Sequence, residues 1–235
     1  MKTKHLLHVT LTSLALISAG CSSLSPHAAT MTKEAQTATT PQQALQNLKS
    51  GNARFVAGTP AKRDHLKQVH ETGHGQFPFA TVVSCLDSRT SSELIFDQGI
   101  GDVFNARIAG NIVNSDILGS LEFASKAAGS KLIAVIGHTH CGAIKGACDK
   151  VKLGNLTGLL EKMDPAVTAT TSAEGEARTS KNAAFVDRVA ETNVRQTMEN
   201  IRKGSPILQQ MEKDGQLAIV GGMYDIETGK VKFIH

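Results

Sequence analysis

Thiol, imidazole and carboxylate side chains are concentrated in two short segments of the 235-residue chain. The first segment contains Cys85, Asp87 and Arg89, and the second places His138 three positions before Cys141. Two Cys sulfurs and one His nitrogen suit Zn²⁺, and three protein ligands leave a fourth coordination position for water. The residue types therefore predict an open, catalytic zinc site that consists of Cys85, His138 and Cys141.

Each of the two segments follows a short apolar run that is typical of a buried strand. Residues 79–84 precede Cys85, and residues 131–137 precede His138. Because neighbouring parallel strands end at the same edge of a sheet, the candidate ligands can meet there. Cys141 also comes directly before a predicted helix that begins near Gly142, where the positive end of the helix dipole favours a thiolate.

Other interpretations of the Cys and His residues remain open at this point. In an exported protein, Cys85 and Cys141 could instead form a disulfide. A thiol-redox role is disfavoured, since the sequence has no Cys-x-x-Cys pair. Spacing favours His138 over His140 as the imidazole ligand. Cys148, seven residues after Cys141, is predicted to pack as a small apolar side chain.

Asp87 and Arg89 also allow two interpretations. An isolated Asp and Arg at this spacing would usually form a structural ion pair. Beside a metal ligand, an Asp held by an Arg fork can reach the fourth metal position or accept a hydrogen bond from zinc-bound water. The second interpretation is favoured because Cys85 lies only two residues before Asp87.

The pattern of apolar residues predicts an α/β fold with a central, mostly parallel β-sheet flanked by helices, an N-terminal helical arm and C-terminal strands. Strands are predicted at residues 79–84, 102–108, 131–137, 216–224 and 230–234. Helices are predicted at residues 41–55, 61–70, 115–128, 141–152, 153–163 and 182–202 and again from Pro206 onward, with a mobile loop at 165–180.

Composition limits the classes of partner. The chain is 40% hydrophobic and 20% charged, which suits one globular domain. The formal charge of +4 falls to +2 if Lys2 and Lys4 are removed with a leader, and no basic cluster marks a nucleic-acid surface. With no Trp and one Tyr, the chain has few aromatic platforms for bases or sugars. We therefore expect a small-molecule substrate and no nucleic-acid partner.

The N-terminal residues predict export to the periplasm. Lys2 and Lys4 precede an apolar run at 6–19 that is too short to span a bilayer, so residues 1–20 read as a signal peptide. Residues 18–21 resemble a bacterial lipoprotein cleavage site, after which Cys21 would carry a lipid anchor. Cleavage without lipidation is the alternative. Residues 21–40 predict a disordered tether, and residues 41–235 the folded domain.

Together the two segments resemble the signature motifs of the β-class carbonic anhydrases. The motifs are Cys85-x-Asp87-Ser88-Arg89 and Gly137-His138-Thr139-x-Cys141-Gly142, and the resemblance extends from about Pro41 to the C-terminus. Gln76-x-Pro78 and Arg107-x-Ala109-x-Asn111 are further matches. The resemblance implies the β-carbonic anhydrase fold and the reversible hydration of carbon dioxide to bicarbonate and a proton by zinc-bound hydroxide, with one Zn²⁺ per subunit.

The same resemblance assigns roles to individual residues. Asp87 and Arg89 would form the catalytic dyad, and Phe104 and Phe123 would line the substrate pocket. Gln76 would donate a hydrogen bond to bicarbonate from across a subunit interface. The resemblance therefore also implies a homodimer or a homotetramer, with the N-terminal helices wrapped around the partner subunit.

Some members of the family are inhibited when the motif Asp binds the zinc, a state that a bicarbonate site with a Trp and a Tyr stabilises. Here Val82 stands where that Trp is expected, so we expect Arg89 to hold Asp87 off the metal. Two other functions remain open. One is hydrolysis of carbon disulfide or carbonyl sulfide on the same scaffold, and the other is that of a non-catalytic zinc-binding lipoprotein.

Overall fold

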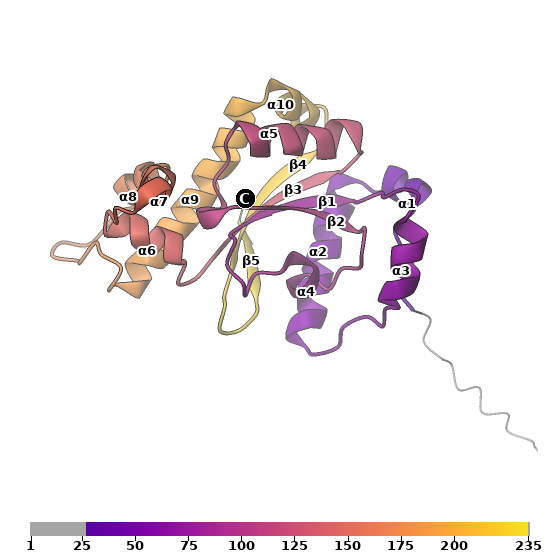
Figure 1. Ribbon diagram of the computed structural model, residues 1–235, viewed down its shortest axis with the longest axis horizontal. Coiled ribbons are helices and arrows are strands. Elements are labelled where there is room, and N and C mark those ends of the chain that lie inside the picture. Colours follow the sequence, from indigo (N-terminus) through magenta and orange to yellow (C-terminus); the bar gives the residue numbers. More distant parts are fainter. Residues whose placement is uncertain (1–26, 235) are drawn as a thin grey trace, which may run out of the picture.

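A five-stranded sheet forms the centre of the computed structural model, which describes residues 27–234 (Figure 1). The strand order is β2-β1-β3-β4-β5. The first four strands are parallel, and β5 pairs antiparallel with β4. The strands are β1 (Ala80–Ser84), β2 (Val103–Arg107), β3 (Leu132–His138), β4 (Ala218–Tyr224) and β5 (Val231–Ile234). The predicted α/β fold with a mostly parallel sheet is confirmed.

Helices cover both faces of the sheet. On one face, Leu132, Ala134 and Ile136 of β3 pack in a core cluster with residues of α2 (Pro41–Val56) and α4 (Ser92–Ile95). On the other face, Ile133 and Val135 pack with residues of three helices. These helices are α5 (Ser115–Glu122), α9 (Ala183–Gly204) and α10 (Pro206–Lys213). Because β1 and β3 are buried on both faces, their sequences are mostly apolar and do not alternate between apolar and polar residues.

A third core cluster lies beyond the carboxyl ends of the strands. It is formed by α6 (Gly142–Cys148), α7 (Gly154–Glu161), α8 (Asp164–Ala169) and the first half of α9. Cys85 and Cys141 belong to this cluster and are 4% and 1% exposed. The two candidate thiols are therefore enclosed largely by apolar side chains.

Several elements differ from the prediction in their extent. The helix predicted at 141–152 ends at Cys148, and Lys150 adopts a left-handed backbone with φ 52°. Within the predicted loop at 165–180, residues 165–169 form most of α8, because Pro165 fits the first turn of a helix and Ala166 is fully buried. The helix predicted at 115–128 ends in a π-helical turn, Phe123–Ala127.

The N-terminal arm consists of α1 (Lys33–Ala38), α2 and α3 (His65–Thr72). Helix α1 lies within the segment predicted to be a disordered tether. It forms because Thr32 caps its first turn and because Gln36, which is buried, donates hydrogen bonds to the carbonyl groups of Pro78 and Ala128. The predicted signal peptide and Cys21 lie outside the described residues. Among residues 27–234, no helix has the length and apolar character needed to cross a bilayer.

Strand register places the two sequence motifs side by side. Ser84, the last residue of β1, pairs with Ile136 of β3. Cys85, the next residue, therefore lies opposite Gly137, which directly precedes His138, the last residue of β3. This register is the structural basis of the candidate site.

A buried carboxylate fastens the arm to the domain. The Asp97 side chain is 4% exposed and pairs with Arg54 of α2 and with Arg63, which is 9% exposed. It also accepts a hydrogen bond from the backbone of Ala61 at 3.1 Å. Burial by itself would raise the pKa of Asp97, but the hydrogen bonds from Arg54, Ala61 and Arg63 lower it.

Replacement Asp97→Asn should therefore destabilise the protein. Two Arg side chains lose their counter-charge, and breaking a buried ion pair from one side costs about 3 kcal/mol of unfolding free energy. Because the folded-state pKa is lowered, this contribution is complete above the ordinary Asp pKa of about 4 and is lost as the pH falls through the folded-state value. Urea unfolding at neutral and acid pH should show a deficit that shrinks on acidification.

The matched control for this prediction is Glu161→Gln, which removes the exposed Lys152–Glu161 pair. An exposed pair contributes at most about 1 kcal/mol, so this variant should unfold almost like wild type. Equal stability of the Asp97→Asn variant and this control would contradict the prediction.

Candidate metal centre

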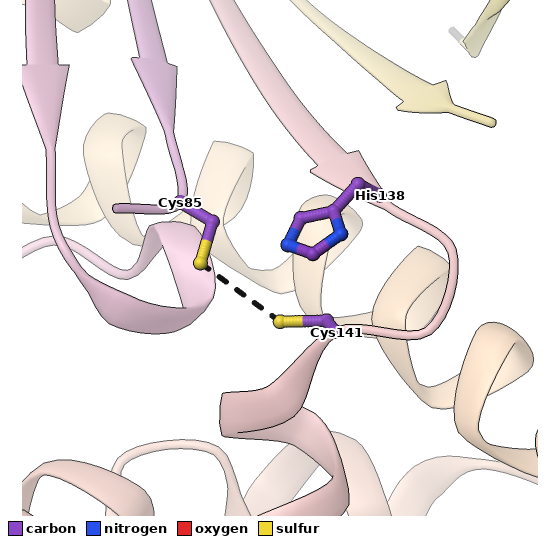
Figure 2. Close-up of side chains that lie close together, drawn as sticks. All are labelled: Cys85, His138 and Cys141. Carbon is purple, nitrogen blue, oxygen red and sulfur yellow. Dashed lines mark hydrogen bonds between the residues drawn. The ribbon is translucent and has the colours of Figure 1, made fainter. Parts of the chain in front are cut away.

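Three side chains from two strand ends and one helix start converge at the carboxyl edge of the sheet (Figure 2). Cys85 follows β1, His138 is the last residue of β3, and Cys141 is the N-cap residue of α6. Their potential ligand atoms all lie within 4.8 Å of one another, and all three residues are buried. The structure thus brings together the three residues predicted as metal ligands.

The geometry of the sulfur atoms fits a shared ion better than a disulfide. Cys85 Sγ and Cys141 Sγ are 4.0 Å apart, and both cysteines are free. With Zn–S bonds of about 2.3 Å in a tetrahedral site, two sulfurs on one zinc ion lie roughly 3.8 Å apart. The alternative of a Cys85–Cys141 disulfide is therefore not what the structure shows.

His138 is oriented as a metal ligand would be. Its Nδ1 is 2.9 Å from the carbonyl oxygen of Thr139, which fixes the proton on that nitrogen. Its Nε2 is buried and has no hydrogen-bond partner among the described residues. A buried nitrogen lone pair without a hydrogen-bond partner destabilises the folded state. A metal ion bound to Nε2 would remove this penalty. The donor set and its orientation fit Zn²⁺.

The two thiols already favour partial ionisation. The hydrogen bond shared with Cys141 lowers the pKa of Cys85, and His138 and the backbone of Gly110 contribute in the same direction. The pKa of the Cys141 thiol is raised by its interaction with Cys85 and by burial, so Cys141 keeps its proton more readily. A divalent cation at the cluster would displace this remaining proton, because metals bind the thiolate form.

Asp87 and Arg89 lie next to this cluster as a two-pronged ion pair. Asp87 Oδ1 accepts hydrogen bonds from the backbone nitrogen and Nε of Arg89, both at 2.9 Å, and Oδ2 accepts one from Nη2 at 2.7 Å. These hydrogen bonds lower the pKa of Asp87. Asp87 Oδ2 is 3.9 Å from His138 Nε2, so the carboxylate reaches the cluster while Arg89 holds it.

Neighbouring side chains hold the loop that carries Cys85 and Asp87. The Thr90 hydroxyl, which is buried, donates to the carbonyl groups of Cys85 at 3.1 Å and Asp87 at 2.9 Å. Arg107, at the end of β2, donates from Nε to the Cys85 carbonyl at 3.1 Å. Sequence reasoning identified Arg107 only as a motif match and missed Thr90. A lone Thr in a loop gives no signal that would reveal such a bracing role.

The other predicted site residues lie away from the ligands within one chain. Gln76 is exposed and precedes β1, so it lies at the opposite end of the strand from Cys85. Phe104 of β2 and Phe123 have ring centroids 6.4 Å apart in an edge-on arrangement, and Phe123 is 60% exposed. A single chain therefore does not bring Gln76 to the cluster and does not enclose Phe123.

The remaining candidates from the sequence have other surroundings. His140 Nε2 lies 3.5 Å from Glu227 Oε1, and His140 is not part of the three-residue cluster. Cys148 is buried in α6 among apolar residues, and burial raises the pKa of its thiol. Both placements agree with the choice of His138 and with the packing role predicted for Cys148.

Comparisons with known proteins agree with this geometry. The family model described as "Carbonic anhydrase" matches residues 80–231. "Carbonic anhydrase 2" of Mycobacterium tuberculosis is 36% identical over 201 residues, which cover 82% of this chain and 92% of that protein. "Carbonic anhydrase" of Mycolicibacterium smegmatis is 34% identical over 194 residues, with the same coverage of 82% and 92%.

Solved structures show the same fold. "The beta-carbonic anhydrase CcaA" aligns with a TM-score of 0.62 and 24% identity over 82% of this chain and 86% of that one. A structure reported among "two tetrameric beta-carbonic anhydrases" from Sordaria macrospora aligns with a TM-score of 0.59 and 25% identity over 82% and 97%. The scaffold is that of the β-class carbonic anhydrases, and the Cys85–His138–Cys141 group on it could hold a metal ion. The chain belongs to this family and is a carbonic anhydrase.

Proposed function

We propose that this chain catalyses the reversible hydration of carbon dioxide to bicarbonate and a proton, with one zinc ion per subunit held by Cys85, His138 and Cys141. Membership of the family and the names of the relatives support the reaction. The observation that carries the proposal is the convergence of two sulfurs and an imidazole nitrogen, which has no hydrogen-bond partner within residues 27–234, beside an Arg-held carboxylate.

The donor set suits the proposed metal. When bound, zinc supplies Lewis acidity that makes a coordinated water acidic enough to lose a proton near neutral pH. The thiolates of Cys85 and Cys141 together balance the charge of a divalent ion, which limits the cost of burying it. The apolar surroundings of the cysteines keep bulk water away, which strengthens electrostatic interactions there. Carbon dioxide is uncharged and linear and suits such surroundings.

Asp87 orients the attacking water and does not store its proton. Because Arg89 lowers the pKa of Asp87, the carboxylate is ionised at neutral pH and is a poor proton carrier. An ionised carboxylate is a strong hydrogen-bond acceptor, and it would turn the oxygen of a bound water toward carbon dioxide. The proton then passes to solvent or buffer.

Replacement Asp87→Asn should reduce kcat/KM for CO₂ hydration by about 10²-fold, since misplacement of a reacting group costs rate at this scale. The zinc content should stay at wild-type level, because Asp87 is not among the three ligands. Stopped-flow hydration assays and elemental analysis of the purified protein measure the two quantities. Cys141→Ser should lose both zinc and activity.

The control for this experiment is Asp214→Asn, which changes an exposed carboxylate in the turn after α10 and should leave both quantities unchanged. Wild-type protein that holds zinc but hydrates CO₂ no faster than buffer would contradict the proposed reaction. Sulfide release from carbon disulfide or carbonyl sulfide by such protein would instead assign it to the alternative hydrolase. Inactivity on all three substrates would favour a non-catalytic zinc-binding protein.

We also propose that the active form is a homodimer or a homotetramer in which each site is completed by the partner subunit. One structure among the similar proteins is described as tetrameric. Strand β2 is an edge strand, and the exposed Phe123 packs against Phe104 of this strand. An edge strand beside an exposed aromatic side chain suits a partner subunit. Gln76 lies at the far end of β1 and could act only from the partner.

Two inactive variants should therefore complement each other. Gln76→Ala chains lack the donated hydrogen bond, and Asp87→Asn chains lack the orienting carboxylate. In a mixed dimer, one of the two sites combines an intact Gln76 with an intact Asp87. After unfolding and refolding an equimolar mixture, we expect about a quarter of wild-type activity, since half of the dimers hold one intact site. Activity no greater than the average of the separate variants would contradict a shared site.

We propose, finally, that the protein is exported and anchored in the periplasm by a lipid on Cys21. The support is the basic start, the short apolar run and the small residues before Cys21. In a bacterial host, wild-type chain should incorporate labelled palmitate and fractionate with membranes, whereas Cys21→Ala should do neither. Cys148→Ala, the control, should behave like wild type. Soluble, unlabelled wild-type protein would contradict the anchor.

A further inference from the structure

Helix α9 reaches the metal centre at two points although it supplies none of the three candidate ligands. The two residues concerned are Asp187 and Asn193, neither of which belongs to the sequence motifs. They are six residues apart, which corresponds to about 9 Å along a helix axis. Each forms a hydrogen bond to a backbone segment that adjoins a ligand.

Asp187 holds the segment between two ligands. Its Oδ1 accepts a hydrogen bond of 2.8 Å from the backbone nitrogen of His140, which lies between His138 and Cys141. His140 has φ 56°, a left-handed conformation that is uncommon and strained for a residue other than glycine. Helix capping does not explain the position of Asp187, since Asn182 is the N-cap and accepts from Phe185 in the first turn.

Asn193 holds the backbone segment that lies next to Cys85, the third candidate ligand. Its side chain, 3% exposed, donates a hydrogen bond of 2.7 Å from Nδ2 to the carbonyl oxygen of Gly110. The Gly110 nitrogen in turn donates to Cys85 Sγ at 3.4 Å. Gly110 has φ 72°, and a Cβ there would lie 2.3 Å from Met163 Sδ, so only glycine fits. Asn is a poor residue for a helix interior, which makes this buried position notable.

Helix α9 is a rigid base for both contacts. At Gly137, the residue before His138, a Cβ would lie 2.7 Å from Val194 Cγ2 of α9. The helix therefore packs directly against β3 beside the ligand. Val189, Val194 and Ile201 on the same helix are fully buried, which fixes its rotation.

We propose that Asp187 and Asn193 are positioning residues for the metal centre, and this inference depends on the proposed zinc site. Asp187 keeps the His138–Cys141 segment in the conformation that sets the ligand spacing. Asn193 aims the Gly110 N–H group at Cys85 Sγ, where it stabilises the thiolate. Partners of this kind outside the ligand set govern how well ligands are oriented before the ion binds.

The test measures metal affinity, by competition with a chromophoric chelator, and the absorption spectrum of the Co²⁺-substituted protein. Asp187→Ala and Asn193→Asp should each bind Zn²⁺ about 10- to 100-fold more weakly than wild type, as is usual for loss of such partners. Their Co²⁺ spectra should also change, because thiolate and imidazole orientation changes. Asp187→Asn keeps an acceptor oxygen and should recover most of the affinity.

A purely structural role predicts a different result. It would lower the thermal midpoint of the variants but leave the metal affinity and the Co²⁺ spectrum of the folded protein unchanged, and this outcome would overturn the inference. Asn200→Ala, an exposed position on the same helix, is the control and should match wild type. If Asp187→Ala does not fold, Asp187→Glu displaces the carboxylate by one methylene and should weaken metal binding in the same way.

The readout separates this inference from the proposed reaction. Wild-type protein that binds Zn²⁺ tightly without hydrating CO₂ would overturn the reaction. The comparison of metal affinities among the variants would then still decide the role of Asp187 and Asn193.

Discussion

The pairing register of β1 and β3 is the constraint on which the metal centre depends. Ser84 pairs with Ile136, so Cys85 and His138 emerge from adjacent strands within one residue of each other. A slip by one residue would turn every side chain of a strand to the opposite face of the sheet. Such a slip is prevented because both faces of β3 are buried, against α2 on one side and α9 on the other. Packing of the whole domain therefore sets the ligand geometry.

Burial of the three candidate ligands would couple the fold to a bound metal ion. Two thiols 4.0 Å apart in apolar surroundings cannot both ionise without a counter-charge, and His138 Nε2 has no partner among the described residues. A bound divalent cation would balance the charge of the two thiolates and would accept the lone pair of His138 Nε2. Metal binding should consequently contribute to the stability of the carboxyl edge of the sheet as well as to catalysis.

The sequence was sufficient for the sheet and for the convergence of the three candidate ligands, because both depend on local patterns. Apolar runs that end at Cys85 and His138 predicted the strands, and the motif spacing selected His138 over His140. The extent of the helices was harder to predict, because it depends on long-range contacts. Helix α1, for example, is stabilised by hydrogen bonds from Gln36 to the carbonyl groups of residues 78 and 128. The roles of Asp187 and Asn193 could not be predicted, because a single hydrogen bond across the fold leaves no periodic signal.

The residues around Asp87 fix the orientation of its carboxylate and do not make the carboxylate a stronger base. A carboxylate whose pKa is lowered by Arg89 offers little driving force for accepting a proton, so its value lies in where its oxygens point. Thr90 and Arg107 hold the backbone on either side of it. The loops that carry the candidate ligands are thus braced from β2 on one side and from α9 on the other, and small displacements of either support would disturb the proposed alignment of water and substrate.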